Sequence, residues 1–196
     1  ERDIWDVEPG AWSLISVRGS GNLTITGSGT LSAKENDCYA VDVQDKNAQL
    51  TIEGGTYLGN IHAVYVESGS ALIKGGTYSV QQKFPTAGKE NEFVLNLYDA
   101  HREDGTAKLS VTGGTFYEFN PYDCKAEGEG TNFCAAGYCT SKYTSKGSTK
   151  YTVQVASVEV ISGDKHDYYS NLSAAISAAK DGDTVKLLKD GTASSL

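Results

Sequence analysis

Apolar and polar residues alternate in a short segment that occurs four times along the chain. Three copies, at residues 50–57, 71–78 and 109–116, contain two glycines followed by a threonine and an aromatic residue, and a looser copy lies at 23–31. Alternation with a period of two predicts a strand with one buried face. The glycines predict a bend at a position where a side chain would obstruct the backbone. Segments repeated every few tens of residues are typical of a solenoid.

A second set of short strands is expected between these segments, at residues 40–44, 63–67 and 94–98. Aligned with one another, these strands give two apolar columns that would face inward: Val41, Val64 and Leu95, and Val43, Val66 and Leu97. Their remaining positions give two outward columns: Asp42, Tyr65 and Asn96, and Gln44, Glu67 and Tyr98. With the Thr-aromatic segments this makes about three strands per turn of chain, which predicts an all-β parallel β-helix of about four to five coils.

The same register predicts contacts between repeats. Glu53 and Lys74 would lie one above the other on an exposed face. An aromatic column would contain Tyr57, Tyr78 and Phe116, either as structural packing or as a stacking surface for a ligand. Two segments, at about residues 80–92 and 118–150, leave the repeat and are expected to be long loops, where recognition usually resides.

The ends of the chain differ from the repeats. Residues 1–20 are expected to form two short strands of a first, irregular coil. The tail is expected to form a strand at 158–161, a short amphipathic helix within 170–180 and a strand at 184–188. Ser170 is the expected N-cap of that helix, and its expected apolar face is Leu172, Ala175, Ile176 and Ala179. We therefore divide the chain into a β-helix at 1–155 and a strand–helix–strand element at 156–196.

Composition excludes several classes of partner. The 196 residues carry a net charge of −8, which argues against binding to nucleic acid or to an anionic membrane surface. No segment approaches the ~20 apolar residues of a membrane span, so membrane insertion is not expected. The chain starts at Glu1 and contains no methionine, and we expect it to have been processed or excised from a longer protein.

The repeats resemble those of right-handed parallel β-helix (pectate-lyase-like) modules in bacterial adhesin-like surface proteins and phage virion fibres. Residues 113–153 are similar to the closing coil of such modules through Gly113-Gly114-Thr115-Phe116, Asn120-Pro121, Thr131-Asn132-Phe133, Ala136-Gly137-Tyr138 and Tyr151-Thr152-Val153. Residues 170–188 look like the element that opens and caps a β-helix. The resemblance specifies the fold better than the activity, because this architecture hosts lyases, hydrolases, adhesins and tailspikes alike.

The order of these elements is unusual, since the capping element here follows the coils. Either it belongs to the next module of a tandem array, or residues 170–196 of one chain cap the first coil of another in a head-to-tail assembly. The resemblance also implies an extracellular location, on a cell or virion surface.

The chain contains four cysteines, Cys38, Cys124, Cys134 and Cys139. Three of them lie within residues 118–150, so they are candidates for a disulfide that pins this loop, in keeping with an extracellular setting. Four free thiols are the alternative, and Cys38 is also interpretable as a buried apolar residue. The spacing is too loose for a structural zinc site, and we expect no metal and no other cofactor.

Catalysis on such a scaffold would need carboxylates on neighbouring coils. Asp42, Asp45 and Asp99 are the candidates for a polysaccharide lyase or glycoside hydrolase. Asp45 and Asp99 fall in equivalent rows two coils apart, at ~9.6 Å, which suits an inverting pair of acids. Exposed carboxylates in turns are the simpler interpretation, and we do not expect an enzyme.

The outward columns suggest a different function. Asp42, Gln44, Tyr65, Glu67, Asn96 and Tyr98 are candidates for binding a glycan, because tyrosine rings stack on sugars while amides and carboxylates bind their hydroxyl groups. An ordinary solvated sheet face has the same composition. The leading hypothesis is a non-catalytic extracellular adhesion module or virion fibre that binds a glycan or host ligand through its loops and one sheet face. A self-assembling structural subunit is a further hypothesis.

Overall fold

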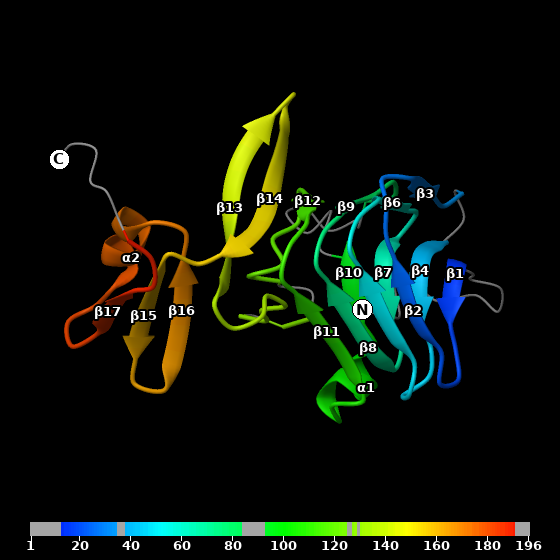
Figure 1. Cartoon of the computed structure of the whole chain (residues 1–196), viewed down its shortest axis with the longest axis horizontal. Helices are drawn as coiled ribbons and strands as arrows, with labels where there is room; N and C mark the ends of the chain where they lie inside the picture. Colours follow the sequence, from blue (N-terminus) through cyan, green and yellow to red (C-terminus); the bar gives the residue numbers. More distant parts are fainter. Residues whose placement is uncertain (1–12, 35–37, 84–92, 125–126, 129, 191–196) are drawn as a thin grey trace.

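The computed structural model describes residues 13–34, 38–83, 93–124, 127–128 and 130–190. Within these ranges the chain is mostly strand with two short helices, so the protein is all-β, as expected (Figure 1). The strand expected before Ser13, residues 84–92 of the first long loop and residues 191–196 of the tail lie outside the described residues.

Three sheets are built mainly from the repeats, each of which supplies one strand to each sheet. Sheet A contains β1 (Ser13–Val17), β4 (Tyr39–Val43), β7 (His62–Val66) and β10 (Leu95–Leu97). Sheet B contains β2 (Asn22–Ile25), β5 (Gln49–Ile52), β8 (Gly69–Ile73) and β11 (Ala107–Val111). Sheet C contains β3 (Thr30–Ser32), β6 (Thr56–Gly59), β9 (Thr77–Val80), β12 (Thr115–Tyr117), β14 (Ser148–Val155) and β13 (Tyr138–Ser145). Strands from successive repeats pair in parallel, whereas β14 pairs antiparallel with both β12 and β13.

The pairing register is the one expected from the sequence. In sheet A, Val64 pairs with both Val41 and Leu95. In sheet B, Lys74 Nζ lies 3.2 Å from Glu53 Oε1, which confirms the predicted ion pair. Period-two alternation thus fixed which residues of neighbouring repeats lie side by side.

The predicted aromatic column is present and entirely buried. The ring centroids of Tyr57 and Tyr78 lie 5.1 Å apart, and those of Tyr78 and Phe116 lie 4.9 Å apart, with nearly parallel planes. All three side chains are at most 1% exposed. The column therefore packs the core and presents no surface to a ligand.

Glycine pairs between sheets B and C are required by the close approach of successive repeats. A Cβ atom on Gly113 would lie only 2.1 Å from the carbonyl oxygen of Lys74. The following residue, Gly114, has a φ of +104°, a conformation that other residues rarely adopt. In the preceding repeat, the buried hydroxyl of Tyr78 donates to the carbonyl oxygen of Gly75 at 2.7 Å.

Part of the segment expected to be a long loop at 118–150 is regular structure. β13 and β14 form a hairpin that continues sheet C beyond β12 and projects from the stacked strands (Figure 1). Its two-residue turn, Lys146-Gly147, has φ values of +52° and +80°, as a type I′ turn requires. Before the hairpin, Phe119 and Phe133 are buried against the main core, so the segments around these two residues cover that end of the sheets.

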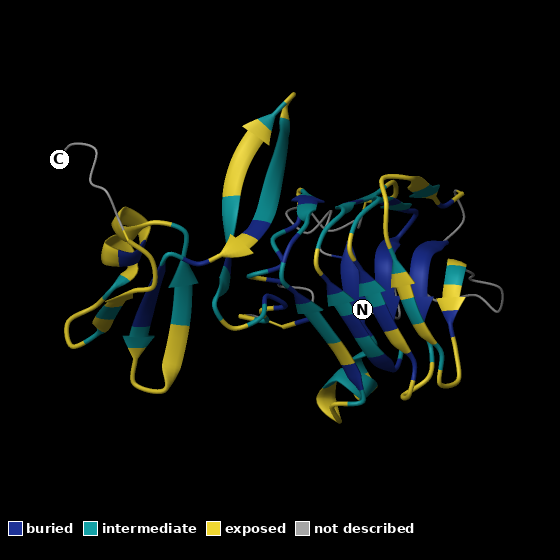
Figure 2. Cartoon of the chain, in the orientation of Figure 1, coloured by how far each residue is buried: buried dark blue, intermediate teal, exposed yellow. Residues whose placement is uncertain are grey.

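The C-terminal residues form a separate antiparallel sheet. β15 (Val158–Ser162) lies between β16 (Lys165–Tyr169) and β17 (Thr184–Leu187). α2 (Leu172–Ala178) packs on this sheet, and the small core between them contains the side chains of Val158, Val160 and Ala175. Figure 2 shows that this region is more exposed than the stacked strands of sheets A and B.

Two details of the predicted helix are wrong. Its N-cap is Asn171 rather than Ser170, because the Asn171 side chain accepts a hydrogen bond from the backbone N–H of Ala174 at 2.8 Å. Leu172 and Ile176 are 47% and 58% exposed, so only part of the expected apolar face is buried. The helix spans only seven residues, and its turns contact the sheet through Ala175.

Candidate functional site

The outer face of sheet A, the glycan-binding surface expected from the sequence, is covered. Asp42, Tyr65 and Asn96 do share one row of the sheet, as predicted. They are only 2%, 6% and 7% exposed, so the exposure expected for them is wrong. The other three candidates, Gln44, Glu67 and Tyr98, are half-buried. Side chains packed in this way leave little surface for a sugar.

His62 lies inside this covered face. Its ring centroid is 4.9 Å from that of Tyr39 and 5.4 Å from that of Tyr65. Nδ1 donates to the carbonyl oxygen of Phe93 at 2.8 Å, and Nε2 lies 3.4 Å from the Asn96 side-chain nitrogen. Burial lowers the pKa of His62 to about 4. The hydrogen bond to Phe93 raises this pKa, but it offsets only part of the effect of burial. The imidazole is therefore neutral at pH 7 and serves as a structural group.

The three candidate catalytic acids lie in different environments, each with a structural partner. Asp42 is buried and accepts a hydrogen bond from the Gln44 amide at 2.7 Å. Asp45 accepts one from the backbone N–H of Gly19 at 2.6 Å and so holds a turn. Asp99 begins α1 (Asp99–Glu103) and lies 3.5 Å from the Arg102 guanidinium.

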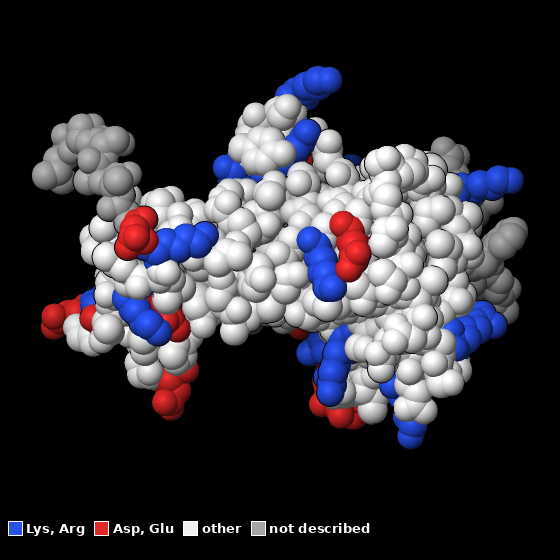
Figure 3. Space-filling model, in the orientation of Figure 1, with Lys and Arg blue, Asp and Glu red and all other residues white. Residues whose placement is uncertain are grey.

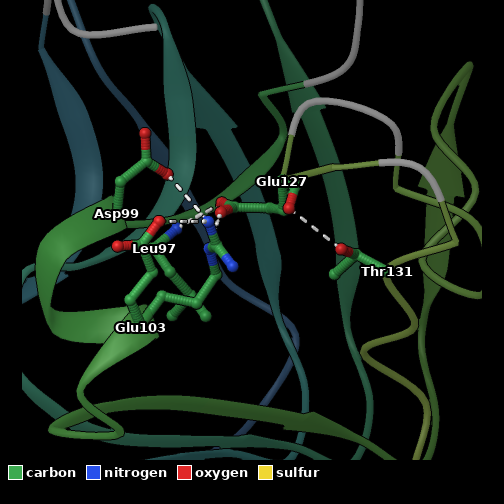
Figure 4. Close-up of polar contacts among 6 residues, drawn as sticks. Leu97, Asp99, Glu103, Glu127 and Thr131 are labelled. Carbon is green, nitrogen blue, oxygen red and sulfur yellow. Dashed lines mark hydrogen bonds and ion pairs between the residues drawn. The ribbon is translucent and has the colours of Figure 1, made fainter.

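A buried carboxylate that the sequence did not reveal terminates sheet A. Glu127 Oε1 accepts a hydrogen bond from the backbone N–H of Leu97 in the edge strand β10 at 2.7 Å, in the place of a further strand (Figure 4). Its Oε2 lies 2.9 Å from Arg102 Nε, and the side chain is 0% exposed. Burial raises the pKa of Glu127 to about 7. Desolvation of the carboxylate raises this pKa more than the Leu97 hydrogen bond and the charge of Arg102 lower it. Asp99 raises the same pKa further by charge repulsion.

All four cysteines are buried thiols in the structure, so the expected disulfide is not present. Burial raises the pKa of Cys134 to about 12 and also raises that of Cys139. Because the thiolate is the reactive form, these two side chains are inert at neutral pH. Their contribution is to packing: Cys124 and Cys134 belong to the main core.

Among the described residues, no group of three or more His, Cys, Asp or Glu side chains is placed to hold a metal ion. The helices that the structure describes are too short and too polar to cross a membrane.

The outer face of sheet C carries a row of hydroxyl groups. The residues pair one with the next across all six strands, and we call them the hydroxyl row: Thr30, Thr56, Thr77, Thr115, Thr152 and Ser141. The aromatic column next to them points into the core, so alternation directs the hydroxyl row outward. All six residues are exposed or half-buried. At the strand spacing of about 4.8 Å, the row presents repeated donors and acceptors. Within the row, the hydroxyl groups of Thr115 and Thr152 also bond each other at 3.2 Å.

Two tyrosines and a lysine lie beside the hydroxyl row at the hairpin. Tyr117 of β12 pairs with Lys150 of β14, which pairs with Tyr143 of β13. Lys150 Nζ lies 4.5 Å from the ring centroid of Tyr117 and 6.0 Å from that of Tyr143. Tyr143 is 46% exposed. We call these three residues the tyrosine–lysine row; they have the flat, partly apolar character of a surface on which sugar rings stack.

The sequence contained a signal for one of these rows. Threonine follows the glycine pair at Thr56, Thr77 and Thr115, and the predicted register stacks these positions on the exposed side of the strand. The tyrosine–lysine row had no such signal, because Lys150 reaches Tyr117 only through an antiparallel pairing of distant strands.

The charge distribution distinguishes sheet B from the hairpin. Figure 3 shows that the broad surface over sheet B is largely uncharged, apart from basic and acidic side chains that lie side by side. The same figure shows basic atoms along the hairpin. Glu53 and Lys74 form an ion pair on sheet B. Sheet B therefore offers a reference surface on the same scaffold, where Lys74 has a carboxylate partner.

Comparisons with protein families, with curated proteins and with solved structures found no match for this chain.

Proposed function

We propose that this protein is a non-catalytic module of a cell-surface or virion-surface protein, and that it binds an extended glycan on the outer face of sheet C. In this proposal the three sheets are the sides of a right-handed parallel β-helix. The parallel pairing of successive repeats supports that winding, as does the right-handed rule for connections between parallel strands. A stiff stack of this kind displays a long, flat surface.

The hydroxyl row carries the proposal. A polyhydroxylated polymer needs hydrogen-bonding groups that both donate and accept, and six hydroxyl residues in register supply them along one line. The adjoining Tyr117 and Tyr143 supply ring faces against which the apolar face of a sugar packs. In the described strands of sheet B the equivalent row is shorter, and Leu72 interrupts it between Thr51 and Ser110.

The absence of catalysis is also part of the proposal. Asp42 is 2% exposed, and Asp45 and Asp99 each hold a local structural partner. Release of reducing ends from a polysaccharide panel tests this point. We expect no release above a blank, and release that is lost in Asp99→Asn would instead support the alternative of a polysaccharide-degrading enzyme.

Binding itself is tested with a glycan array followed by titration calorimetry on the tightest ligand. Tyr143→Ala should weaken binding about 2- to 10-fold, the range that one aromatic contact provides. Thr77→Val should weaken it as well, whereas Thr51→Val, the same change on sheet B, should not. An array without a bound glycan, or equal effects of Thr77→Val and Thr51→Val, would overturn the proposal.

Self-association through residues 170–196 is a second candidate function. The observation that favours it is the exposure of apolar side chains there: Leu172, Ile176 and Leu187 are 47%, 58% and 59% exposed. Light scattering of the full chain and of a chain truncated at residue 169 tests it. Assemblies of the full chain that are lost on truncation would support a joint in this region, and a monodisperse full chain would exclude one.

A further inference from the structure

The hairpin is a basic segment of an acidic protein. The chain has a net charge of −8. Between residues 130 and 158, however, its charged side chains are Lys142, Lys146 and Lys150, with no Asp or Glu. Basic atoms follow the upright hairpin in Figure 3. This local excess of positive charge lies beside the proposed glycan-binding surface.

Unlike three lysines elsewhere in the structure, the hairpin lysines have no ion-pair partner among the described carboxylates. Lys74, Lys165 and Lys186 each form an ion pair with a carboxylate, at 3.2, 2.8 and 3.0 Å. Within the described residues, no carboxylate lies within ion-pair distance of Lys142, Lys146 or Lys150. The Glu118 carboxylate accepts a hydrogen bond from the backbone N–H of Thr149 in this hairpin at 2.6 Å, but it forms no ion pair with the three lysines.

Lys150 is the best positioned of the three. Its Nζ is held between two rings, 4.5 Å from the centroid of Tyr117 and 6.0 Å from that of Tyr143. A hydrogen bond to Tyr117 raises the pKa of Lys150 above its ordinary value, so the side chain is charged at every pH at which the protein would function. A ligand that stacks on the rings brings its substituents to this ammonium group.

We propose that the glycan bound by the outer face of sheet C is anionic, and that a carboxylate or sulfate group of the glycan binds Lys150 between Tyr117 and Tyr143. The inference rests on the proposed function, since it assigns a class of ligand to the same surface. A neutral glycan would use the hydroxyl row and the rings but would leave the cation without a counter-ion. The negative charge of the rest of the molecule disfavours nucleic acid, whose charge is denser than that of most acidic glycans.

Two matched pairs of polymers test the inference: hyaluronan with its carboxyl-reduced form, and dextran sulfate with dextran. Each pair shares a backbone and differs in charge. Titrations at low and high salt should show that at least one acidic polymer binds about 10-fold or more tightly than its neutral partner, with affinity that falls as salt screens the charges. Equal affinity within both pairs, or no binding of any of the four polymers, would overturn the inference.

Single substitutions test whether Lys150 is responsible for the tighter binding of the acidic polymer. Lys150→Gln should reduce affinity for the acidic polymer about 3- to 5-fold, the upper part of the range for a solvent-accessible ion pair. Lys74→Gln, on the outer face of sheet B, should leave affinity unchanged, and thermal melting should show that both variants are folded. Equal affinity of Lys150→Gln and Lys74→Gln would contradict the assignment, as would equally tight, Lys150-dependent binding of single-stranded DNA.

The two proposals fail in different ways. If the proposed function is wrong, the glycan array shows no ligand at all. If only the further inference is wrong, the array shows a ligand and the acidic and neutral members of each pair bind alike.

Discussion

The buried carboxylate of Glu127 makes the stability of this protein depend on pH in a way that one substitution can isolate. Glu127 closes the edge of sheet A by accepting the Leu97 N–H at 2.7 Å. Burial raises its pKa from the ordinary value of 4.5 to about 7. Between these two values the folded state keeps a proton that the unfolded state has released. Stability therefore falls as pH rises through this window.

The size of the effect follows from the same two pKa values. The contribution of Glu127 is fully present below pH 4.5, where the group is protonated in both states, and it is lost as pH rises through about 7. The loss amounts to about 3 kcal/mol, a large part of the stability of a typical domain.

The substitution that removes the titration but keeps the hydrogen bond is Glu127→Gln, because the amide oxygen still accepts the Leu97 N–H. This variant should match the wild type near pH 4.5 and exceed its stability at pH 8.5, by up to about 3 kcal/mol. Glu127→Ala removes the acceptor and leaves a buried N–H without a partner. It should be less stable than Glu127→Gln at every pH, by about 1–3 kcal/mol.

His62 changes the pH dependence of stability in the opposite direction, so its contribution has to be distinguished from that of Glu127. Burial lowers the pKa of His62 from 6.5 to about 4, so between these values the unfolded state binds more protons and stability rises with pH. The two contributions nearly cancel below pH 6.5, and the pH profile of the wild type alone would conceal both. The difference between Glu127→Gln and the wild type removes the His62 contribution, because both chains contain it.

The assay is urea unfolding of the wild type and both variants at intervals from pH 4.5 to pH 8.5, read by circular dichroism. A difference in unfolding free energy between Glu127→Gln and the wild type that grows with pH is the expected result. A constant difference would show that the pKa of Glu127 is not raised. Lower stability of Glu127→Gln at pH 8.5 would show that Arg102 and Leu97 hold the carboxylate ionised after all.

Three further predictions concern the scaffold. Gly113→Ala should lower the unfolding free energy by more than about 2 kcal/mol, since its Cβ would meet the Lys74 carbonyl at 2.1 Å, whereas Gly29→Ala, where the space is open, should have little effect in the same urea titration. Tyr78→Phe should cost about 1 kcal/mol by leaving the Gly75 carbonyl without its hydroxyl donor; an unchanged urea midpoint would argue against that hydrogen bond. Asn171→Ala should destabilise α2 by about 1 kcal/mol and Ser170→Ala by much less, and hydrogen exchange of the α2 amides distinguishes the true N-cap from the predicted one.

The sequence was sufficient to predict the repeats and their register. Glycine pairs and period-two alternation are local signals, and they place Tyr57 over Tyr78 and Glu53 beside Lys74 without knowledge of the rest of the fold. The hairpin was missed because its turn, Lys146-Gly147, lacks the asparagine or aspartate that usually marks a type I′ turn.

Burial of outward positions could not be predicted from the repeats. Asp42 and Tyr65 alternate with valines as an exposed polar row would, and their burial depends on what packs over that face. Glu127 is a similar case, since nothing in its local sequence indicates a buried carboxylate that closes a sheet edge 30 residues away. Features made by distant segments are the ones that sequence patterns do not record.

The measurement that tests the central claim most directly is an NMR titration of the labelled protein with the tightest glycan from the array. Binding on the outer face of sheet C predicts that amide shifts change in β9, β12 and β14 and stay constant in β2, β5 and β8. Changes confined to sheet B or to the C-terminal sheet, or no changes at saturating glycan, would contradict the account.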